Sequence, residues 1–486
     1  MYAPQHCAHI ADEPMRSPTS LSTLFTPKAL SWISLLAALA GCGGGSSAPI
    51  ATIDPLKVDS SYGVDGAIKL RSPAPAAIAL QPDGKLLLTG SRQTAPLPAN
   101  NYGGAPAREV YVRRLTVDGA VDKSFGNNGE VTFNVKGSDA PGDMKLQSNG
   151  RIIVSVYAGE TCVINFLSLY APCVTPAGTY AIRSSNLVAL TPEGLIDKTF
   201  GTDGIAQTTP SENPQRLSLA VAADQSLSLL WSTGLARAQI YGRGLSMFSK
   251  DGGAVPTATT PASPVPCEAS GESLLRQRNG QIFSAGGRGY TSYADPSLHP
   301  GVCIAKHDPK TGAQTSGAWT KFGGNYSLFE LVPTEDDGFA AVGTNCVQKN
   351  CQLAIARFGA EGAPLTSYGQ QSISSLSVPE YTSLTSSLVL PDGSMVVLAN
   401  KVVYEANFSN PKTGGLWMRI DRNGAPVKDF GTQGILSTPL SNVVPSKFLP
   451  DAQGRWLVVS VDRDPSATTT DNDYVVVQRT AGHSKP

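Results

Sequence analysis

Hydrophobic and polar positions along the chain repeat in blocks of about sixty residues. Each block opens with a short predicted strand. A tight turn that contains Gly follows, and then a nearly unbroken apolar run, such as Leu86-Leu87-Leu88. Apolar runs of this length are typical of strands that are buried on both faces. The turn glycine of successive blocks falls at Gly84, Gly150, Gly280, Gly338, Gly393 and Gly454, with Gln225 in the equivalent place of a weaker copy.

The second half of a block is equally regular. After a third strand comes another Gly turn, and in four blocks an aromatic residue follows that glycine six residues later. Each block is therefore expected to form four short strands, A to D, joined by turns in which glycine accepts positive φ. We expect each aromatic side chain to pack between neighbouring sheets. The pairs are Gly119 with Phe125, Gly194 with Phe200, Gly362 with Tyr368, and Gly424 with Phe430.

Seven such blocks predict an all-β fold: a single seven-bladed β-propeller with four antiparallel strands per blade. Small sheets with two apolar faces must stack to bury them, and radial stacking closes into a ring. The ends of the chain favour closure. Residues 61–70 hold only the aromatic turn and the last strand of a block, and the chain ends with the first three strands of another. The N-terminal strand should therefore complete the last blade.

Two signatures recur in these blocks. One is the turn Asp83-Gly84-Lys85, and the other is the spacing of Asp122, Phe125, Gly126 and Gly129. Both resemble the delta-60 repeat of bacterial exported proteins, over most of residues 58–480. The resemblance implies a propeller-like repeat and no agreed biochemical activity. The third and fourth copies depart from the pattern, because neither has a Phe-Gly pair at the expected place after its turn glycine, Gly252 or Gly312.

The start of the chain has the pattern of a targeting segment. Residues 29–40 form an apolar stretch that is too short to span a bilayer. The segment Leu39-Ala40-Gly41-Cys42 resembles a bacterial lipobox, which implies cleavage before Cys42 and a lipid on that cysteine. Gly43, in place of Asp, implies by the same resemblance the outer membrane of a bacterial cell envelope. An ordinary signal peptide with a chance cysteine is the alternative. The expected regions are 1–41, a lipoprotein signal peptide; 42–57, a lipidated tether; and 58–486, the propeller.

Composition narrows the classes of partner. Charged residues make up 16% of the chain and the formal net charge is zero. Nucleic-acid binding needs clustered Lys and Arg, so no nucleic-acid partner is expected. Beyond Cys7 and Cys42, six cysteines remain, and an even set in an exported chain suggests disulfides, with a metal site as the alternative. Near neighbours are Cys162 with Cys173, Cys267 with Cys303, and Cys346 with Cys351; the connectivity itself stays open.

Candidate chemistry is sparse. The chain after Cys42 has three histidines, His299, His307 and His483, and no two are spaced like metal ligands. His307 is expected to have a surface role at a strand end. No catalytic motif is recognisable, so no cofactor is predicted and whether the chain is an enzyme stays open, with a non-catalytic role favoured. Four acidic residues around the last B–C loop suit either calcium or a solvated loop. They are Asp462, Asp464, Asp471 and Asp473.

Loop lengths indicate where binding would occur. Variation is concentrated between strands B and C and between D and the next A, two loop sets that emerge on one side of a propeller. Variable loops on a rigid scaffold commonly bind ligands; neutral drift is the alternative. We therefore expect a monomeric, envelope-anchored binding or scaffold propeller that holds a protein partner or a glycan. Candidate binding residues are Tyr102, Tyr170, Tyr180, Tyr241, Tyr290, Tyr293 and Tyr404.

The alternative function is that of a propeller-type enzyme, such as a lactonase or a lyase, with its site at the central channel. Strand A would line that channel. Its residues in the first and sixth blocks, 77–80 and 386–390, are mostly apolar or small. This composition favours the non-catalytic interpretation over the enzyme.

Overall fold

The computed structural model describes residues 57–95, 106–160, 183–208, 214–235, 240–256, 273–287, 301–321, 325–347, 350–379, 382–403, 412–463 and 473–481. Contacts divide the chain into residues 1–49 and 50–486, and everything described here lies in the second unit. Every regular element in these ranges is a β-strand, so the all-β prediction is confirmed for the described residues.

Five sheets have four strands each. Four of them follow chain order. Their strands are β10 (Pro214–Val221), β11 (Leu227–Leu235), β12 (Ile240–Phe248) and β13 (Ala254–Val255); β14 (Ser273–Arg276), β15 (Ile282–Gly287), β16 (Gly301–His307) and β17 (Gln314–Lys321); β18 (Asn325–Pro333), β19 (Phe339–Val347), β20 (Asn350–Phe358) and β21 (Ile373–Val378); and β22 (Thr382–Val389), β23 (Met395–Val403), β24 (Lys412–Ile420) and β25 (Ile435–Ser437).

The fifth four-stranded sheet joins the two ends of the described chain. Its order is β1 (Ala67–Arg71), β28 (Tyr474–Arg479), β27 (Trp456–Asp462) and β26 (Val443–Pro450). β1 pairs antiparallel with β28, from Ala67 opposite Gln478 to Arg71 opposite Tyr474. The predicted completion of the last sheet by the N-terminal strand is therefore confirmed. An ion pair between Lys69 and Asp462, at 2.6 Å, also links the two ends.

The remaining eight strands form one continuous sheet. They are β2 (Ala77–Leu80), β3 (Leu86–Gln93), β4 (Arg108–Leu115), β5 (Glu130–Phe133), β6 (Ser138–Leu146), β7 (Ile152–Gly159), β8 (Arg183–Leu190) and β9 (Ile205–Gln207).

The prediction of seven separate blades is wrong, because hydrogen bonding forms five four-stranded blades and one eight-stranded sheet. The eight-stranded sheet holds the strands of the first two sequence blocks. They are joined where β4 and β6 pair in parallel at Arg108 and Ser138. The link between β5 and β6 folds back so that the Arg108 amide donates to the Gly137 carbonyl at 2.8 Å. A short link that lies along β4 thus removes the boundary between the two blocks.

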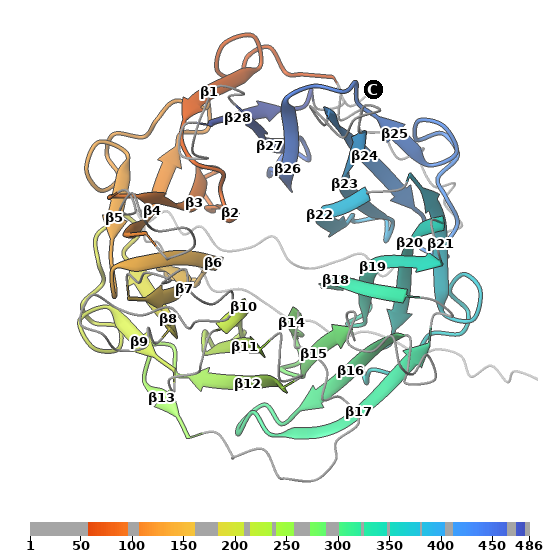
Figure 1. The fold of residues 1–486 in the computed structure, drawn as a ribbon, viewed down its shortest axis with the longest axis horizontal. Helices are drawn as coiled ribbons and strands as arrows, with labels where there is room; N and C mark the ends of the chain where they lie inside the picture. The colour runs from red at the N-terminus through yellow and green to blue at the C-terminus, as the bar shows by residue number, and fades with distance from the viewer. Residues whose placement is uncertain are drawn as a thin grey trace, which may run out of the picture. The chain divides into compact units, whose positions relative to one another are not determined.

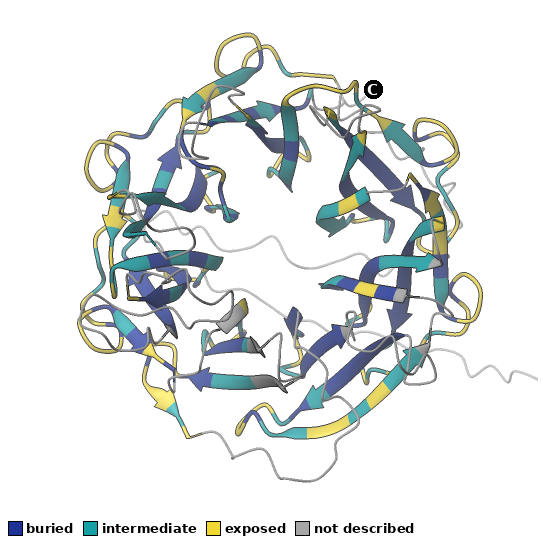
Figure 2. Cartoon of the chain, in the orientation of Figure 1, coloured by how far each residue is buried: buried dark blue, intermediate teal, exposed yellow. Residues whose placement is uncertain are grey.

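The sheets of this unit are arranged as a β-propeller (Figure 1). The innermost strands contact one another in the order β2, β6, β10, β14, β18, β22 and β26, and β26 contacts β2 again. We call these strands the inner ring. Figure 2 shows that the middle strands of the sheets are buried and the outer ones more exposed. Leu87 of β3 and Val154 of β7 are fully buried in a core shared by neighbouring blocks, each contributing about 1.5–3 kcal/mol to the stability of the fold.

Candidate functional site

The two edges of the propeller differ in the regularity of their connections. Antiparallel strands place the A–B and C–D turns at one edge, which we call the turn edge, and the B–C and D–A connections at the other, the loop edge. The A–B turns all have one length, as in residues 81–85 and 334–338. The B–C connections range from residues 348–349, between β19 and β20, to residues 160–182, between β7 and β8.

Most predicted binding residues belong to the variable connections. Tyr241 lies in β12, opposite Gly234 of β11. The other six lie outside the described residues: Tyr102, Tyr170, Tyr180, Tyr290, Tyr293 and Tyr404. The predicted lipid site, Cys42, also lies outside them.

At the turn edge, Phe125 connects two sequence blocks. It is fully buried, and a Cβ added to Gly194 of the next block would lie 2.8 Å from its ring. The Gly126 amide donates to the Glu193 carbonyl at 2.8 Å. The Arg114 guanidinium lies 4.6 Å from the centre of the Phe125 ring, and it donates to the Pro192 carbonyl at 2.6 Å. Phe125 thus packs between two sequence blocks of one sheet; the predicted packing between neighbouring sheets is confirmed for Phe200, which lies against Gly252 of the sheet β10–β13.

A carboxylate completes this contact. Asp122 pairs with Arg114 at 2.9 Å and with Lys85 at 3.2 Å. Hydrogen bonds from Ser124, together with these two cations, hold the pKa of Asp122 well below its usual range, although burial opposes them. The carboxylate therefore stays ionised at neutral pH and orients the guanidinium over the aromatic ring.

The same arrangement recurs around the propeller. Phe200 lies under Gly252, with Arg151 5.6 Å from its ring and paired with Asp197. Tyr62 lies under Gly119, and burial raises the pKa of its hydroxyl to about 12. A cluster that is repeated in several blocks is more simply explained by the joining of blocks than by catalysis. The turn edge is therefore structural in the residues described.

His307 is buried, and the predicted surface role is wrong. Its exposed fraction is 5%. Its Nε2 lies 2.8 Å from the Ser284 hydroxyl and its Nδ1 3.1 Å from the Gly312 carbonyl. Because Gly312 offers only an acceptor, Nδ1 carries the proton and Nε2 accepts from Ser284. Ser284 has no exposed surface, so this Ser–His pair ties β15 to β16 and does not present a nucleophile.

The acidic residues fall into separate contacts. Asp462 pairs with Lys69, and Asp473 is buried. Asp464 and Asp471 lie outside the described residues. Asp337, in the turn after β18, pairs with Arg278 at 2.9 Å. Within the described ranges, no group of three or more His, Cys, Asp or Glu side chains could hold a metal ion.

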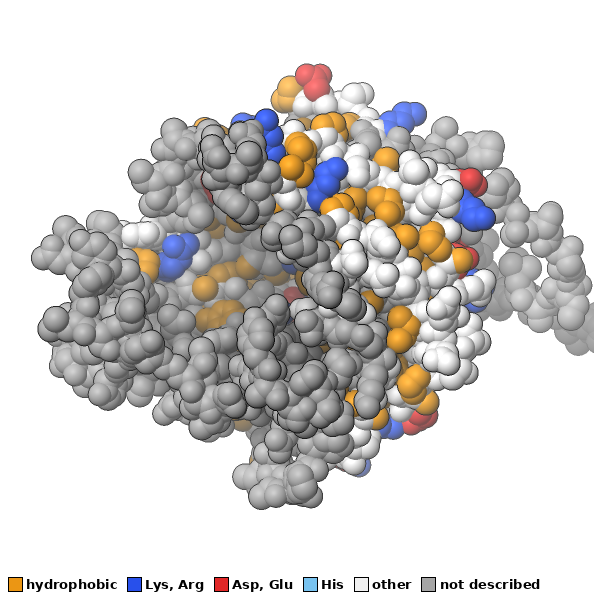
Figure 3. Space-filling view, turned by 45° about the vertical axis from the view of Figure 1, so that its right-hand side comes forward, with side chains coloured by type: hydrophobic (Ala, Val, Ile, Leu, Met, Phe, Trp, Pro, Cys, Tyr) orange, Lys and Arg blue, Asp and Glu red, His pale blue; other side chains and the backbone are white. Residues whose placement is uncertain are grey.

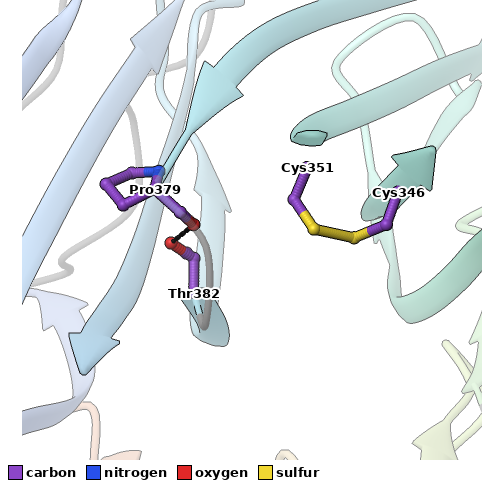
Figure 4. The surroundings of a disulfide bond; sticks show 4 residues. All are labelled: Cys346, Cys351, Pro379 and Thr382. Atoms are coloured by element: carbon purple, nitrogen blue, oxygen red, sulfur yellow. Dashed lines mark hydrogen bonds between the residues drawn. A yellow bond between two sulfur atoms is a disulfide. The ribbon is translucent and has the colours of Figure 1, made fainter. Parts of the chain in front are cut away.

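One predicted disulfide is confirmed. Cys346 of β19 and Cys351 of β20 are bonded across their hairpin, with Cα atoms 4.1 Å apart (Figure 4). The Thr382 hydroxyl nearby donates to the Pro379 carbonyl at 2.6 Å. Cys303 is also disulfide-bonded. The remaining predicted partners, Cys162, Cys173 and Cys267, lie outside the described residues.

A line of hydrogen bonds joins neighbouring strands of the inner ring. The Asp143 carboxylate accepts from the Leu219 amide at 3.2 Å. Ser218 accepts from Leu274 at 3.0 Å, and Ser273 accepts from Leu331 at 2.9 Å. The next link is the hydrogen bond from the Ser387 hydroxyl to Glu330. The residues that form these links, Asp143, Ser218, Ser273 and Glu330, all stand fourth from the end of their strands.

Two lysines depart from this pattern. Lys447 occupies the same fourth-from-last position in β26, where its ammonium donates to the Thr385 carbonyl at 3.3 Å. Lys145 pairs with Asp143 at 3.2 Å, and its side chain is 46% exposed. Burial raises the pKa of Glu330, which lies within electrostatic range of both lysines.

The sequence interpretation of strand A as apolar or small therefore missed a group of charges on the inner ring. That interpretation was based on the first and sixth blocks, whose strand A residues at 77–80 and 386–390 carry no charge. A comparison of β6, β18 and β26 at equal register would have found Asp143, Glu330 and Lys447 at one position.

The described surface in Figure 3 has no single dominant charge. Lys and Arg side chains are scattered among Asp, Glu and uncharged ones, in agreement with a net charge of zero. Within the described ranges, no helix is long and apolar enough to cross a membrane.

No family model matches the chain, and no curated protein matches it significantly. Several solved structures resemble it. A protein of unknown function from Bacteroides caccae is 11% identical, with 63% of this chain and 87% of that one covered and a TM-score of 0.33. A glucose dehydrogenase is also 11% identical, with 85% of this chain and 99% of that one covered and a TM-score of 0.34. A mutant of the NanB sialidase from Streptococcus pneumoniae is 8% identical, with 84% of this chain and 68% of that one covered and a TM-score of 0.36. At these scores the likenesses carry no argument about activity.

Proposed function

We propose that this chain is a non-catalytic binding or scaffold propeller, anchored at a bacterial cell envelope, that holds a protein partner at its loop edge. The observation that carries the proposal is the contrast in connection length between the two edges. The A–B turns keep one length, whereas the B–C connections vary from residues 348–349 to 160–182. Loops that vary on a constant scaffold are the usual place for recognition.

Binding at the loop edge is also supported by the turn edge, where buried side chains already join neighbouring blocks. Phe125, Arg114 and their counterparts join neighbouring blocks there, so substitution of these buried side chains disturbs the fold. The B–C connections at the loop edge differ in length from block to block. New side chains can therefore be introduced at the loop edge at low cost to stability.

The place where the proposed tether joins the propeller is compatible with a partner at the loop edge. The Lys57 carbonyl accepts from the Ala481 amide at 2.7 Å, just beyond the end of β28. The aromatic turn at Tyr62 follows, and it belongs to the turn edge. A tether over residues 42–57 would enter at the turn edge, and its length would let the loop edge turn away from the membrane without fixing the orientation.

The partner claim is tested by removing the longest connection. Residues 160–182 are replaced by Gln-Lys, the natural connection at 348–349, so that β7 and β8 form a tight hairpin. Wild type and variant are used to capture proteins from envelope extract. The control carries Lys123→Glu, Lys198→Glu and Lys428→Glu, three exposed positions of the turn edge.

We expect the loop variant to lose a partner that both wild type and control retain. Loss in the control alone would place binding on the turn edge and contradict the proposal. Capture that persists after protease digestion of the extract would identify a glycan and overturn the protein partner.

The anchor is tested separately by Cys42→Ala. Without a thiol at this position no lipid can be attached, and a single domain on an exported chain should then appear in the soluble fraction of the envelope. Membrane fractions of wild type and variant are compared by immunoblot after a high-salt wash. Equal membrane association of the two proteins would contradict lipid anchoring at Cys42.

A further inference from the structure

The outermost strands of the blocks differ in how well their free edges are protected. A strand with a partner on one side only is a template for a further strand, unless it is short, charged or covered. β9, β13 and β25 have only two or three residues. β1 and β5 carry charged side chains, at Lys69, Arg71 and Glu130. β21 is longer, but its Ser374 is buried and donates to the Gly424 carbonyl of the next sheet at 2.6 Å.

β17 has none of these protections. It has eight residues, and it pairs with β16 on one side and with no described strand on the other. The register shifts between Gln314 and Ser316, which leaves Ser316 to Lys321 in regular pairing with β16. From Ser316 to Thr320 the strand is uncharged and no residue is buried. β17 lies at the rim of the propeller (Figure 1), and Figure 2 shows it as intermediate and exposed along its described length.

This edge is held in place by the rest of its sheet. Trp319 packs against Cys303 and Ala305 of β16, both of which are fully buried. Lys306, the neighbour of Ser316 in β16, has its charge compensated by Glu361 at 2.6 Å. The strand therefore presents an ordered and uncharged edge, and a second strand could pair with it without displacing a charge.

The sequence of the edge is complementary to itself. Two antiparallel copies in one continuous sheet are related by a two-fold axis normal to the sheet, so a residue on the axis faces its own copy. With Ala318 on the axis, Ser316 of one copy lies opposite Thr320 of the other, and Gly317 lies opposite Trp319. Ser–Thr pairs are favourable across strands, and an aromatic ring covers the bare backbone of an edge glycine. Each pair occurs twice, and no like charges face each other.

We propose that two copies of this chain associate by antiparallel pairing of their β17 strands, about a two-fold axis at Ala318. Main-chain hydrogen bonds between the two edges supply the association, and the Ser–Thr and Gly–Trp pairs fix its register. The interface lies at the rim of the propeller, so it goes beyond the proposed partner site and leaves the loop edge open. A dimer of this kind replaces the monomer that we expected from the sequence.

The test measures the oligomeric state of the full chain by sedimentation equilibrium, in a non-ionic detergent so that an attached lipid does not drive association. Ser316→Glu with Thr320→Glu places like charges opposite each other in both copies, whereas Ser316→Glu with Thr320→Lys places opposite charges there. Both variants contain Ser316→Glu, so its effect on the neighbouring Lys306 is the same in each. Ser375→Glu with Ser377→Glu adds two charges at exposed positions of β21 and is the matched control.

We expect a monomer–dimer equilibrium for wild type and a dimer affinity lower by about tenfold or more with two glutamates in β17. The Glu–Lys variant and the β21 control should dimerise as wild type does. A wild type that stays monomeric at every concentration, or unchanged dimerisation of the two-glutamate variant, would overturn the proposal. Loss of the dimer in the β21 control would place the interface elsewhere and contradict it as well.

The register has its own criterion. If lysine at position 320 does not restore the dimer, pairing about Ala318 is refuted. Circular dichroism verifies that each variant is folded. Should the two-glutamate variant fail to fold, the single substitution Ala318→Glu gives the same comparison, because it places two like charges on the axis at an exposed position.

Discussion

Two joints between sequence blocks cover equivalent turn glycines with different side chains. In the Phe125 joint, the aromatic of one block lies under Gly194 of the next, with Arg114 beside its ring. In the Met247 joint, between the sheets β10–β13 and β14–β17, the corresponding glycine is Gly312. A Cβ there would lie 3.1 Å from Met247 Cγ and 3.6 Å from Leu245. A rigid ring is thus replaced by two flexible side chains from strand C.

The next joint around the ring uses a third solution. The sheet β14–β17 also lacks the turn aromatic, and Phe283 of β15 takes its place. A Cβ on Gly362 of the following sheet would lie 2.8 Å from the Phe283 ring. Lys306 replaces the arginine and pairs with the exposed Glu361 at 2.6 Å. The comparison shows that the fold requires an apolar cover over the turn glycine and does not require one residue type to supply it.

The largest difference between the joints is expected from removing the cover. Phe125→Ala should lower the free energy of unfolding by about 3–5 kcal/mol, because a fully buried ring is lost and a cavity remains. Met247→Ala should cost about 2 kcal/mol, because flexible neighbours collapse more easily around the smaller cavity. Urea unfolding monitored by fluorescence measures both. An equal or larger loss for Met247→Ala would show that the two joints are energetically alike.

Adding a methyl group to each turn glycine is the converse experiment. Gly194 and Gly312 both have positive φ, +85° and +70°, so alanine brings a backbone strain of about 1–2 kcal/mol at either position. Gly194→Ala should cost about 1–3 kcal/mol more, since the added Cβ overlaps the Phe125 ring.

Gly280→Ala is the matched control, because Gly280 has φ of +88° and open space around its Cβ. We expect Gly312→Ala to fall close to this control, since Met247 can move aside. A cost for Gly194→Ala no greater than for Gly280→Ala in thermal melts would refute close packing at the Phe125 joint.

The third comparison concerns the stability lost when the cation of each joint is removed. Arg114→Met removes a buried guanidinium from Asp122, and we expect a loss of about 2–3 kcal/mol, since Lys85 remains to compensate the carboxylate. Lys306→Met breaks a pair in which Glu361 is 70% exposed, so the loss should stay below about 1 kcal/mol. Denaturant titrations in low and high salt compare them, and a strong salt dependence for Arg114→Met alone would contradict its burial.

The smallest expected effect is the loss of stability of the Phe125 joint at acid pH. The folded-state pKa of Asp122 is lowered by Ser124, Lys85 and Arg114, so its contribution is complete above the unfolded pKa of about 3.9 and disappears as pH falls toward the folded value. Asp122→Asn should therefore be less stable at pH 7 but lose less stability between about pH 5 and 2. Parallel pH profiles of wild type and variant would contradict the lowered pKa.

Several parts of the fold were predictable because they depend on local patterns. Turn glycines, apolar runs and aromatic turns lie within one block, and each recurs, so the strands and the packing of Phe125 could be read from spacing. Closure through β1 and β28 was also predictable, because an incomplete block at each end leaves one strand missing.

Other features depend on contacts between distant segments. The boundary between the first two blocks is removed by the pairing of Arg108 with Ser138, which depends on the path of one short link. His307 is buried because Ser284 and Gly312 offer it partners, although its place at a strand end suggests exposure. The charges on the inner ring, such as Glu330, could be compared only when β6, β18 and β26 were seen to hold equivalent places in the ring.

By itself the sequence therefore determined the repeat, the strands within it and the closing of its ends, because each follows from periodicity and turn chemistry along a continuous stretch. The tertiary structure alone decided how many separate sheets the strands form, which polar side chains are buried, and which charged side chains lie on the inner ring. These features depend on distances between residues of different blocks, and such distances are set by packing around the whole ring.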